Sequence, residues 1–181
     1  GMQPSDMVVV DLEGRIVEGT LNPSSDTPTH LELYKAFPEI GGVVHTHSTH
    51  AVVFAQAGME ILPLGTTHAD YFYGAVPVSR SLTRDEVQEA YEKNTGRVIV
   101  ETVKETGKQP LAVPGVLVRN HGPFTWGKDP AEAVYHSVVL EEIAEMAWKT
   151  MQINPSAALP PYILEKHYQR KHGPRAYYGQ K

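Results

Sequence analysis

The sequence predicts an α/β protein, a single three-layer α/β/α domain with helices on both faces of a sheet. Short runs rich in Val and Ile alternate with longer stretches of helical periodicity, and two of these stretches open with capping signals. No internal repeat or linker divides the chain, and its 181 residues lie within the usual size of one domain. We therefore interpret residues 1–181 as one domain.

The chain opens with a predicted hairpin followed by a helix. Residues 7–11 and 15–19 flank a Leu-Glu-Gly turn, which is typical of two antiparallel strands. After a polar loop, Asp26 or Thr27 can cap a helix that has Pro28 in its first turn. We expect this helix to end before Pro38 and to turn three side chains inward: Leu31, Tyr34 and Phe37.

The middle of the chain combines a buried strand, a short helix and a polar loop. The β-branched run at residues 43–48, Val-Val-His-Thr-His-Ser, predicts the strand. A short apolar helix is predicted over residues 49–57, with Gly58 ending it in the C′ position. Residues 66–74, Thr-Thr-His-Ala-Asp-Tyr-Phe-Tyr-Gly, predict a loop whose many functional groups indicate more than a connection.

The C-terminal half supplies the longest predicted helices. Capping boxes at residues 83–86 and 129–132 predict helices that run to about residues 105 and 153. Between them, residues 116–118 and 124–126 are predicted strands, and a Pro-rich loop later separates a last helix over 162–171, ended by Gly173. The buried face of the longest helix is expected to carry Val134, Val138, Ile143, Ala147 and Met151.

Composition narrows the functional classes. The chain has no cysteine, which excludes disulfides and thiolate metal sites and fits a cytoplasmic protein. No run of eighteen apolar residues and no apolar leader are visible, so we expect neither a membrane span nor a signal peptide. The net charge of −5, with both signs interspersed, argues against nucleic acid as a partner.

Two histidines one residue apart are the strongest functional signal. On a strand, side chains two residues apart share a face, so His45 and His47 converge on one point. His121, at the polar end of the second predicted strand, is a third candidate ligand. Three imidazoles with an open position are typical of a catalytic zinc site. The alternative is that these are hydrogen-bonded core histidines, which we would prefer for a lone histidine but not for this set.

The sequence indicates the acid/base and phosphate-binding groups less clearly than the candidate metal ligands. The candidates for proton transfer are Asp70, Tyr178, Glu92 and Asp26. Three of them have a simpler reading: Asp26 as a helix N-cap, Asp70 as a turn residue, and Tyr178 as a terminal aromatic without a role. Ser24 and Ser25, just before a helix, can bind phosphate through hydroxyl and backbone N–H groups, although such pairs are more often caps.

Five segments closely resemble the L-ribulose-5-phosphate 4-epimerase family of the class II aldolase/adducin superfamily. They are residues 22–30, 44–48, 65–72, 119–124 and 172–180. The His-x-His segment is shared across the superfamily, whereas Ser-Ser-Asp, Thr-His-Ala-Asp-Tyr and the Tyr-Tyr-Gly-Gln tail are more specific to the epimerases. The similarity begins at Met7, and the family has a preceding segment with substrate and phosphate contacts. From this we expect the chain to bind sugar phosphate weakly.

The resemblance implies a class II aldolase-like fold with a central mixed, largely antiparallel sheet. It also implies a zinc ion on His45, His47 and His121, with Asp26 near the metal. Mn²⁺ and Co²⁺ are the other candidate ions. The family cleaves the C3–C4 bond of L-ribulose 5-phosphate in a retro-aldol step and rejoins it as D-xylulose 5-phosphate.

The resemblance assigns the remaining site residues as well. Asp70 and Tyr178 match the acid/base pair, while four residues match substrate or phosphate positions: Ser24, Ser25, Glu92 and His167. The implied assembly is a homotetramer with sites at subunit interfaces, where the neighbour donates Tyr178.

Two other functions stay open at this point. A class II aldolase acting on fuculose or rhamnulose phosphate is disfavoured by Asp26 and the Asp70 loop. A non-catalytic module like the adducin head is disfavoured because all three candidate metal histidines are present. The sequence does not distinguish an L-arabinose pathway from an ascorbate-type pathway.

Overall fold

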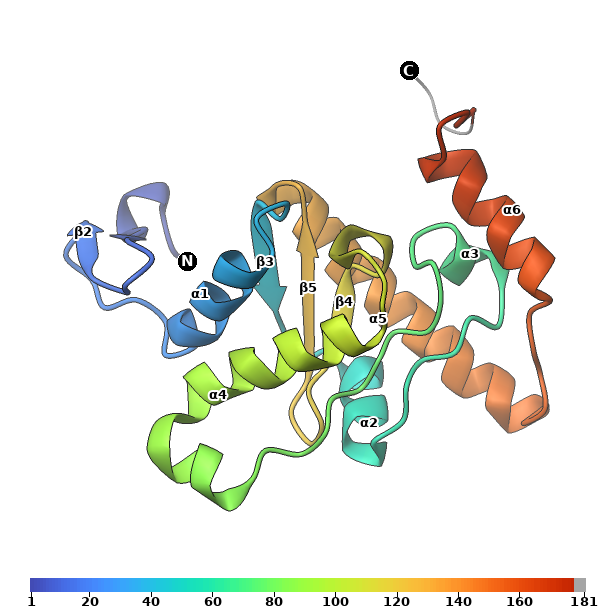
Figure 1. Ribbon diagram of the computed structural model, residues 1–181, viewed down its shortest axis with the longest axis horizontal. Coiled ribbons are helices and arrows are strands. Elements are labelled where there is room, and N and C mark those ends of the chain that lie inside the picture. The colour runs from blue at the N-terminus through green and yellow to red at the C-terminus, as the bar shows by residue number, and fades with distance from the viewer. Residues whose placement is uncertain (178–181) are drawn as a thin grey trace.

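A computed structural model describes residues 1–177 as a small sheet enclosed by helices, with a separate N-terminal hairpin (Figure 1). In chain order the elements are η1 Pro4–Asp6, β1 Val9–Val10, β2 Ile16–Glu18, α1 Thr27–Ala36, β3 Gly42–His45, α2 Thr49–Ala57, α3 Thr66–Ala69, α4 Arg84–Glu105, η2 Pro110–Ala112, β4 Gly115–Leu117, β5 Pro123–Gly127, α5 Pro130–Ile153 and α6 Pro161–His172. The predicted α/β class is confirmed.

The central sheet has the strand order β3-β5-β4, with both pairs antiparallel. Its register places Val44 opposite Thr125 and Val116 opposite Phe124. A single parallel bridge from Val78 to Leu117 adds a short mixed edge beside β4. The sheet is thus largely antiparallel with a mixed edge, as expected.

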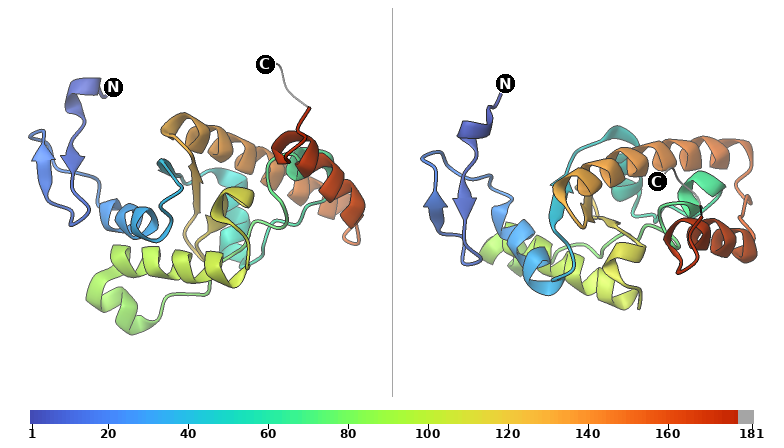
Figure 2. Two further views of the ribbon diagram at one scale, coloured as in Figure 1. Left: turned by 45° about the horizontal axis from the view of Figure 1, so that its top comes forward. Right: turned by 90° about the horizontal axis from the view of Figure 1, so that it is seen from above.

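Side-chain alternation on the strands builds one core on each face of the sheet. Phe124 and Trp126 of β5 pack with Leu33 and Ile99, which belong to α1 and α4. Leu117 points to the other face, where the core is formed with α2 and α5. Figure 2 shows α4 and α5 on opposite sides of the strands, which gives the three layers. Two buried faces explain why the strands are mostly apolar and do not alternate strictly with polar residues.

Helix boundaries follow the capping signals closely. The Thr83 hydroxyl accepts from the Glu86 N–H, and the Glu86 carboxylate accepts from the Thr83 N–H at 2.7 Å, so the first capping box is complete. Asp129 caps α5 through the Glu132 N–H, but the Glu132 carboxylate accepts from the backbone of Lys128 instead. Gly58 ends α2 with a φ of 66°, the left-handed conformation that favours glycine there.

The predicted inward faces of two helices need correction. Ile143 and Ala147 of α5 are buried as predicted, and Met151 is partly buried, but Val134 and Val138 are 53% and 59% exposed. The buried face carries Ala133, His136, Leu140, Ile143, Ala144 and Ala147. At the end of α1, Phe37 is buried as predicted, whereas Leu31 and Tyr34 are only half-buried and the inward face of the helix carries Thr29 and Leu33. When apolar residues occupy two neighbouring faces of a helix, the sequence alone does not determine which face is buried.

Two further boundaries differ from the prediction. Strand β3 ends at His45 and not at residue 48, because its partner β5 starts at Pro123, which has no N–H to extend the ladder. The polar loop at residues 66–74 contains a helical turn, α3, that buries His68 and Ala69.

Across residues 1–177, no helix is long and apolar enough to cross a membrane.

Candidate metal centre

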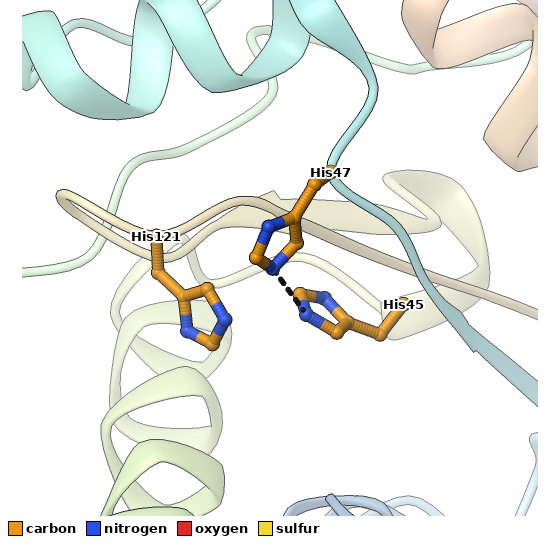
Figure 3. A group of neighbouring side chains, drawn as sticks. All are labelled: His45, His47 and His121. Atoms are coloured by element: carbon orange, nitrogen blue, oxygen red, sulfur yellow. Dashed lines mark hydrogen bonds between the residues drawn. The ribbon is translucent and has the colours of Figure 1, made fainter.

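The three predicted histidines meet at one end of the sheet. His45 is the last residue of β3, His47 lies in the connector to α2, and His121 lies in the turn between β4 and β5. One ring nitrogen from each lies within 4.8 Å of the other two. Figure 3 shows the three rings facing a common point. The predicted convergence of His45 and His47 is correct, although the strand itself ends between them.

Hydrogen bonds orient two of these rings. The Nδ1 of His45 donates to the carbonyl of Pro123 at 2.9 Å, which leaves Nε2 as the bare lone pair facing the group. The Nδ1 of His121 lies 3.4 Å from the hydroxyl of Tyr91, and Figure 3 shows its Nε2 on the side of the other rings. The Nε2 atoms of His45 and His47 are 3.1 Å apart. Outer contacts that fix the far nitrogen are typical of metal-binding histidines, so these residues fit a divalent ion.

Electrostatics favours the neutral imidazoles that a metal requires. Burial lowers the pKa of His45 and of His121, and the neighbouring imidazoles of the group lower both further. The carbonyl of Pro123 partly opposes this shift at His45, and the carboxylate of Asp26 partly opposes it at both residues. A metal binds the unprotonated ring nitrogen, so a lowered pKa leaves these imidazoles able to coordinate a cation near neutral pH.

The turn that carries His121 depends on two small residues. Asn120 adopts a φ of 61°, a left-handed conformation that Asn tolerates better than most side chains. A Cβ on Gly122 would lie 2.8 Å from the carbonyl oxygen of Thr46 and 3.5 Å from the ring of His47. Only glycine therefore allows the turn to approach the segment that carries the other two histidines.

Asp26 lies beside the three imidazoles but outside their ligand group. It occupies the N-cap position of α1, as its simpler reading predicted, yet its carboxylate makes no capping hydrogen bond. It lines a pocket of about 360 Å³ together with Ser24, His30 and His45. This pocket leads from the candidate metal site to the start of α1, so a substrate held there would contact both.

Ser24 and Ser25 border a second pocket, of about 390 Å³, on the other side of the same loop. Lys35 and Lys93 also line it, together with the carboxylates of Glu13 and Glu32, so hydroxyl groups and charges of both signs border the space. Ser24 lines both pockets, and its hydroxyl accepts from the Asp26 N–H at 3.2 Å. Hydroxyl and ammonium groups together are a donor set that suits a phosphate.

Asp70 and His167 form a separate cluster on α3 and α6. The His167 ring lies 3.0 Å from the Asp70 carboxylate, and Arg170 binds both carboxylate oxygens at 3.0 Å. The ammonium of Lys171 lies 3.7 Å from the same carboxylate, as a second cation beside Arg170. In Figure 1, α3 and α6 lie to the right of the sheet, well away from its histidine-bearing lower end. Tyr178, the predicted partner of Asp70, lies outside the described residues.

Glu92 lies just after a break in α4, and its hydrogen bond to α1 is made by the backbone and not by the carboxylate. Ala90 leaves the helical conformation, with φ −163° and ψ 74°, and the helix resumes at Tyr91. The carbonyl of Glu92 then accepts from the buried Thr29 hydroxyl at 2.6 Å, which ties the break to α1. The same break directs Tyr91 toward His121.

Sequence reasoning missed two residues at the site, Tyr91 and His30. His30 could have been found one turn after Asp26 on the same helix face, whereas no sequence signal marks the break that places Tyr91.

His68 is buried inside the segment that carries Asp70. It is 3% exposed, and its Nε2 donates to the carbonyl of Gly74 at 2.7 Å. This hydrogen bond joins two residues that flank Asp70 in the sequence. Burial lowers the pKa of His68 to about 4. The His68 ring binds its second proton more tightly in the unfolded chain than in the folded one, so protonation favours unfolding. The neutral ring therefore contributes to the free energy of unfolding above about pH 6.5, and this contribution is lost as the pH falls toward 4.

We expect the variant His68→Gln to flatten the acid side of the stability profile. Glutamine keeps an N–H donor for the carbonyl of Gly74 but does not titrate. Between pH 6.5 and 4, the wild-type free energy of unfolding should fall more steeply, by up to about 1.4 kcal/mol per pH unit. Urea unfolding at several pH values measures both slopes. Parallel profiles for the two proteins would contradict the assignment.

Comparisons with known proteins agree with this geometry. The class II aldolase and adducin N-terminal domain family matches residues 1–148. L-ribulose-5-phosphate 4-epimerase UlaF of Salmonella paratyphi B is 58% identical over 181 residues, covering 99% of this chain and 78% of the relative. The enzyme of the same name from Salmonella typhi shows the same identity and coverage.

Solved structures share the fold at lower identity. An L-fuculose 1-phosphate aldolase superposes with a TM-score of 0.74 at 23% identity, covering 93% of this chain and 73% of that one. YgbL of Klebsiella pneumoniae gives 0.70 at 23% identity, covering 92% and 75%. These likenesses support the α/β fold and carry no information about the substrate.

Proposed function

The chain belongs to the class II aldolase and adducin family, and on that premise we propose that it is an L-ribulose-5-phosphate 4-epimerase that uses a divalent metal. The observation that carries the proposal is the group of three converging imidazoles, present in a chain that is 58% identical to enzymes of that name. Zn²⁺ is the proposed ion, because three neutral imidazoles with an open position suit it best.

The proposed reaction inverts C4 by breaking and remaking the C3–C4 bond. A base removes the proton of the C4 hydroxyl, C4 becomes an aldehyde, and the C3–C4 bonding electrons pass to the C2–C3 unit. The divalent ion held by His45, His47 and His121 would supply Lewis-acid stabilisation of the negative charge that develops there. The aldehyde carbon then accepts the same electrons on its opposite face, and an acid returns the proton to the C4 oxygen.

Two proton-transfer groups are needed, one on each face of C4. We assign these roles to Asp70 and Tyr178. The contact with His167 and the two bonds from Arg170 fix the orientation of the Asp70 carboxylate. Ser24 and Ser25, with the nearby ammonium groups of Lys35 and Lys93, are proposed to contact the phosphate.

The separation of the two clusters leads us to propose a homotetramer with shared sites. Within one chain, the Asp70 cluster on α3 and α6 lies away from the imidazoles (Figure 1). A site that contains both groups requires a second copy of the chain. The exposed apolar side chains along α5 are consistent with subunit contacts, because such patches are uncommon on monomers. They are Val134, Tyr135, Val138, Met146 and Trp148.

A direct assay with L-ribulose 5-phosphate tests the proposal. We expect formation of D-xylulose 5-phosphate that stops when a chelator removes the metal and returns when Zn²⁺, Mn²⁺ or Co²⁺ is added. The same preparation should be incubated with dihydroxyacetone phosphate and L-lactaldehyde. Aldol product from this pair, without epimerisation of the pentulose phosphate, would identify an aldolase instead. A cytoplasmic location is part of the proposal, because the sugar phosphate is an intracellular metabolite.

A further inference from the structure

His47 is the ligand candidate with the least support from its own side chain. The rings of His45 and His121 each have a contact that fixes the far nitrogen, through Pro123 and Tyr91. In the described part of the chain, the His47 ring is exposed and has a hydrogen-bond partner only in His45. Its position is therefore set by its backbone, in the connector of residues 46–48.

Each end of this connector is held by a different element. At the first end, His45 pairs with Phe124 of β5, and its ring stacks on the ring of Phe124 with centroids 4.1 Å apart. At the second end, the chain enters the first turn of α2, where the early N–H groups have no partner within the helix. Ser48, the N-cap residue, makes no capping hydrogen bond with its side chain.

Glu141 of α5 supplies the missing cap from a distance of ninety residues in sequence. One carboxylate oxygen accepts from the His50 N–H at 2.9 Å, and the other accepts from the Ala51 N–H at 3.0 Å. The His50 ring also contacts the first oxygen, through Nδ1 at 2.8 Å. A carboxylate at this position satisfies two free donors and lies at the positive end of the helix dipole.

The surroundings of Glu141 hold its side chain in place and keep it charged. Its side chain is 25% exposed, and α5 packs on both β3 and β5. Burial raises the pKa of its carboxyl, but the N–H groups of His50 and Ala51 and the side chains of Ser48 and His50 together outweigh this effect and lower the pKa overall. The carboxylate is therefore charged at neutral pH. It links the helix that lies on the sheet to the helix that begins two residues after His47.

We propose that Glu141 is a positioning residue for the metal centre. Its carboxylate fixes the first turn of α2 and thereby holds His47 within reach of a divalent cation shared with His45 and His121. This inference rests on the proposed function, because it requires a metal at the three histidines.

The variant Glu141→Gln tests this role without changing the size of the side chain. An amide has one acceptor oxygen, whereas the carboxylate serves three donors, so the first turn of α2 should loosen. We expect the Zn²⁺ affinity, measured by chelator competition, to fall by about 10-fold or more, the size typical of residues that support ligands. The visible spectrum of the Co²⁺-loaded protein should change at the same time, because it reports ligand geometry.

Two control variants separate positioning from general stability. Glu145→Gln removes a carboxylate one turn further along α5, where it pairs with Lys149 at the surface. Ile143→Val shortens a buried side chain of the same helix, leaves the hydrogen bonds from Glu141 to α2 in place, and should lower the melting temperature. Both should keep the wild-type Zn²⁺ affinity and Co²⁺ spectrum. His50→Ala, which removes only the ring contact, should weaken Zn²⁺ binding by a smaller factor than Glu141→Gln does.

Each result either supports or overturns the proposal. Wild-type affinity and spectrum in both Glu141→Gln and His50→Ala would overturn it. An equal loss of affinity in Ile143→Val would also overturn it, because general destabilisation would then explain the effect. If Glu141→Gln fails to fold, His50→Ala alone decides the matter. Absence of metal binding in the wild-type protein would be a different failure, since it removes the proposed function itself.

Discussion

Replacing His47 with alanine is expected to remove most of the bound metal and nearly all epimerase activity while leaving the domain folded. The side chain is exposed, so its loss costs little packing. Removal of one of three ligands should weaken binding by more than the 10- to 100-fold that follows from loss of a supporting residue. Metal analysis of the purified variant, with circular dichroism to check the fold, measures both parts.

The other histidines make this experiment specific. His45→Ala and His121→Ala should also lose the metal, although loss of the His45 ring from its stack on Phe124 should lower stability as well. His172→Ala removes an imidazole from α6, away from the sheet, and should retain wild-type metal content. Unchanged metal content in all three sheet-end variants would refute the assignment of the site.

Local sequence signals predicted most of the fold because their physical causes are local. The capping box at Thr83 and Glu86, the C-terminal glycine at Gly58 and the two-residue histidine spacing each act within a few residues. The three candidate ligands were recognisable from residue type and position alone. Their arrangement survives the early end of β3, because the chain remains close enough to β5 for Thr46 to donate to the carbonyl of Pro123.

Features that depend on tertiary contacts were not predictable. Which face of α5 is buried depends on how the helix packs against the sheet. Leu140 is buried and Val138 is exposed, although both are apolar. The break at Ala90 is stabilised by side chains from elsewhere, including Thr29, and so leaves no local pattern. The separation of Asp70 from the histidines is likewise a property of the whole fold, and it motivates the second large prediction.

Single variants in either half of the proposed site should be nearly inactive. Asp70→Asn removes a carboxylate that we propose as one of the two proton-transfer groups, and its loss should lower turnover by about 10²-fold or more. Tyr178→Phe is expected to have an effect of similar size. Neither substitution touches the imidazoles, so both proteins should retain the metal that His47→Ala loses. Turnover and metal content measured together place each residue in one half or the other.

Mixed oligomers of His47→Ala and Asp70→Asn subunits should recover activity that neither variant has alone. If each site takes its imidazoles from one subunit and its Asp70 from a neighbour, random assembly in equal amounts gives about one quarter of sites with both halves intact. Co-expression with two different affinity tags isolates the mixed species for assay. Mixing His47→Ala with His121→Ala should restore nothing, because both defects lie in the same half. Failure of the first mixture in verified mixed oligomers would mean that one chain forms the entire site, and the tetramer proposal would lose its main support.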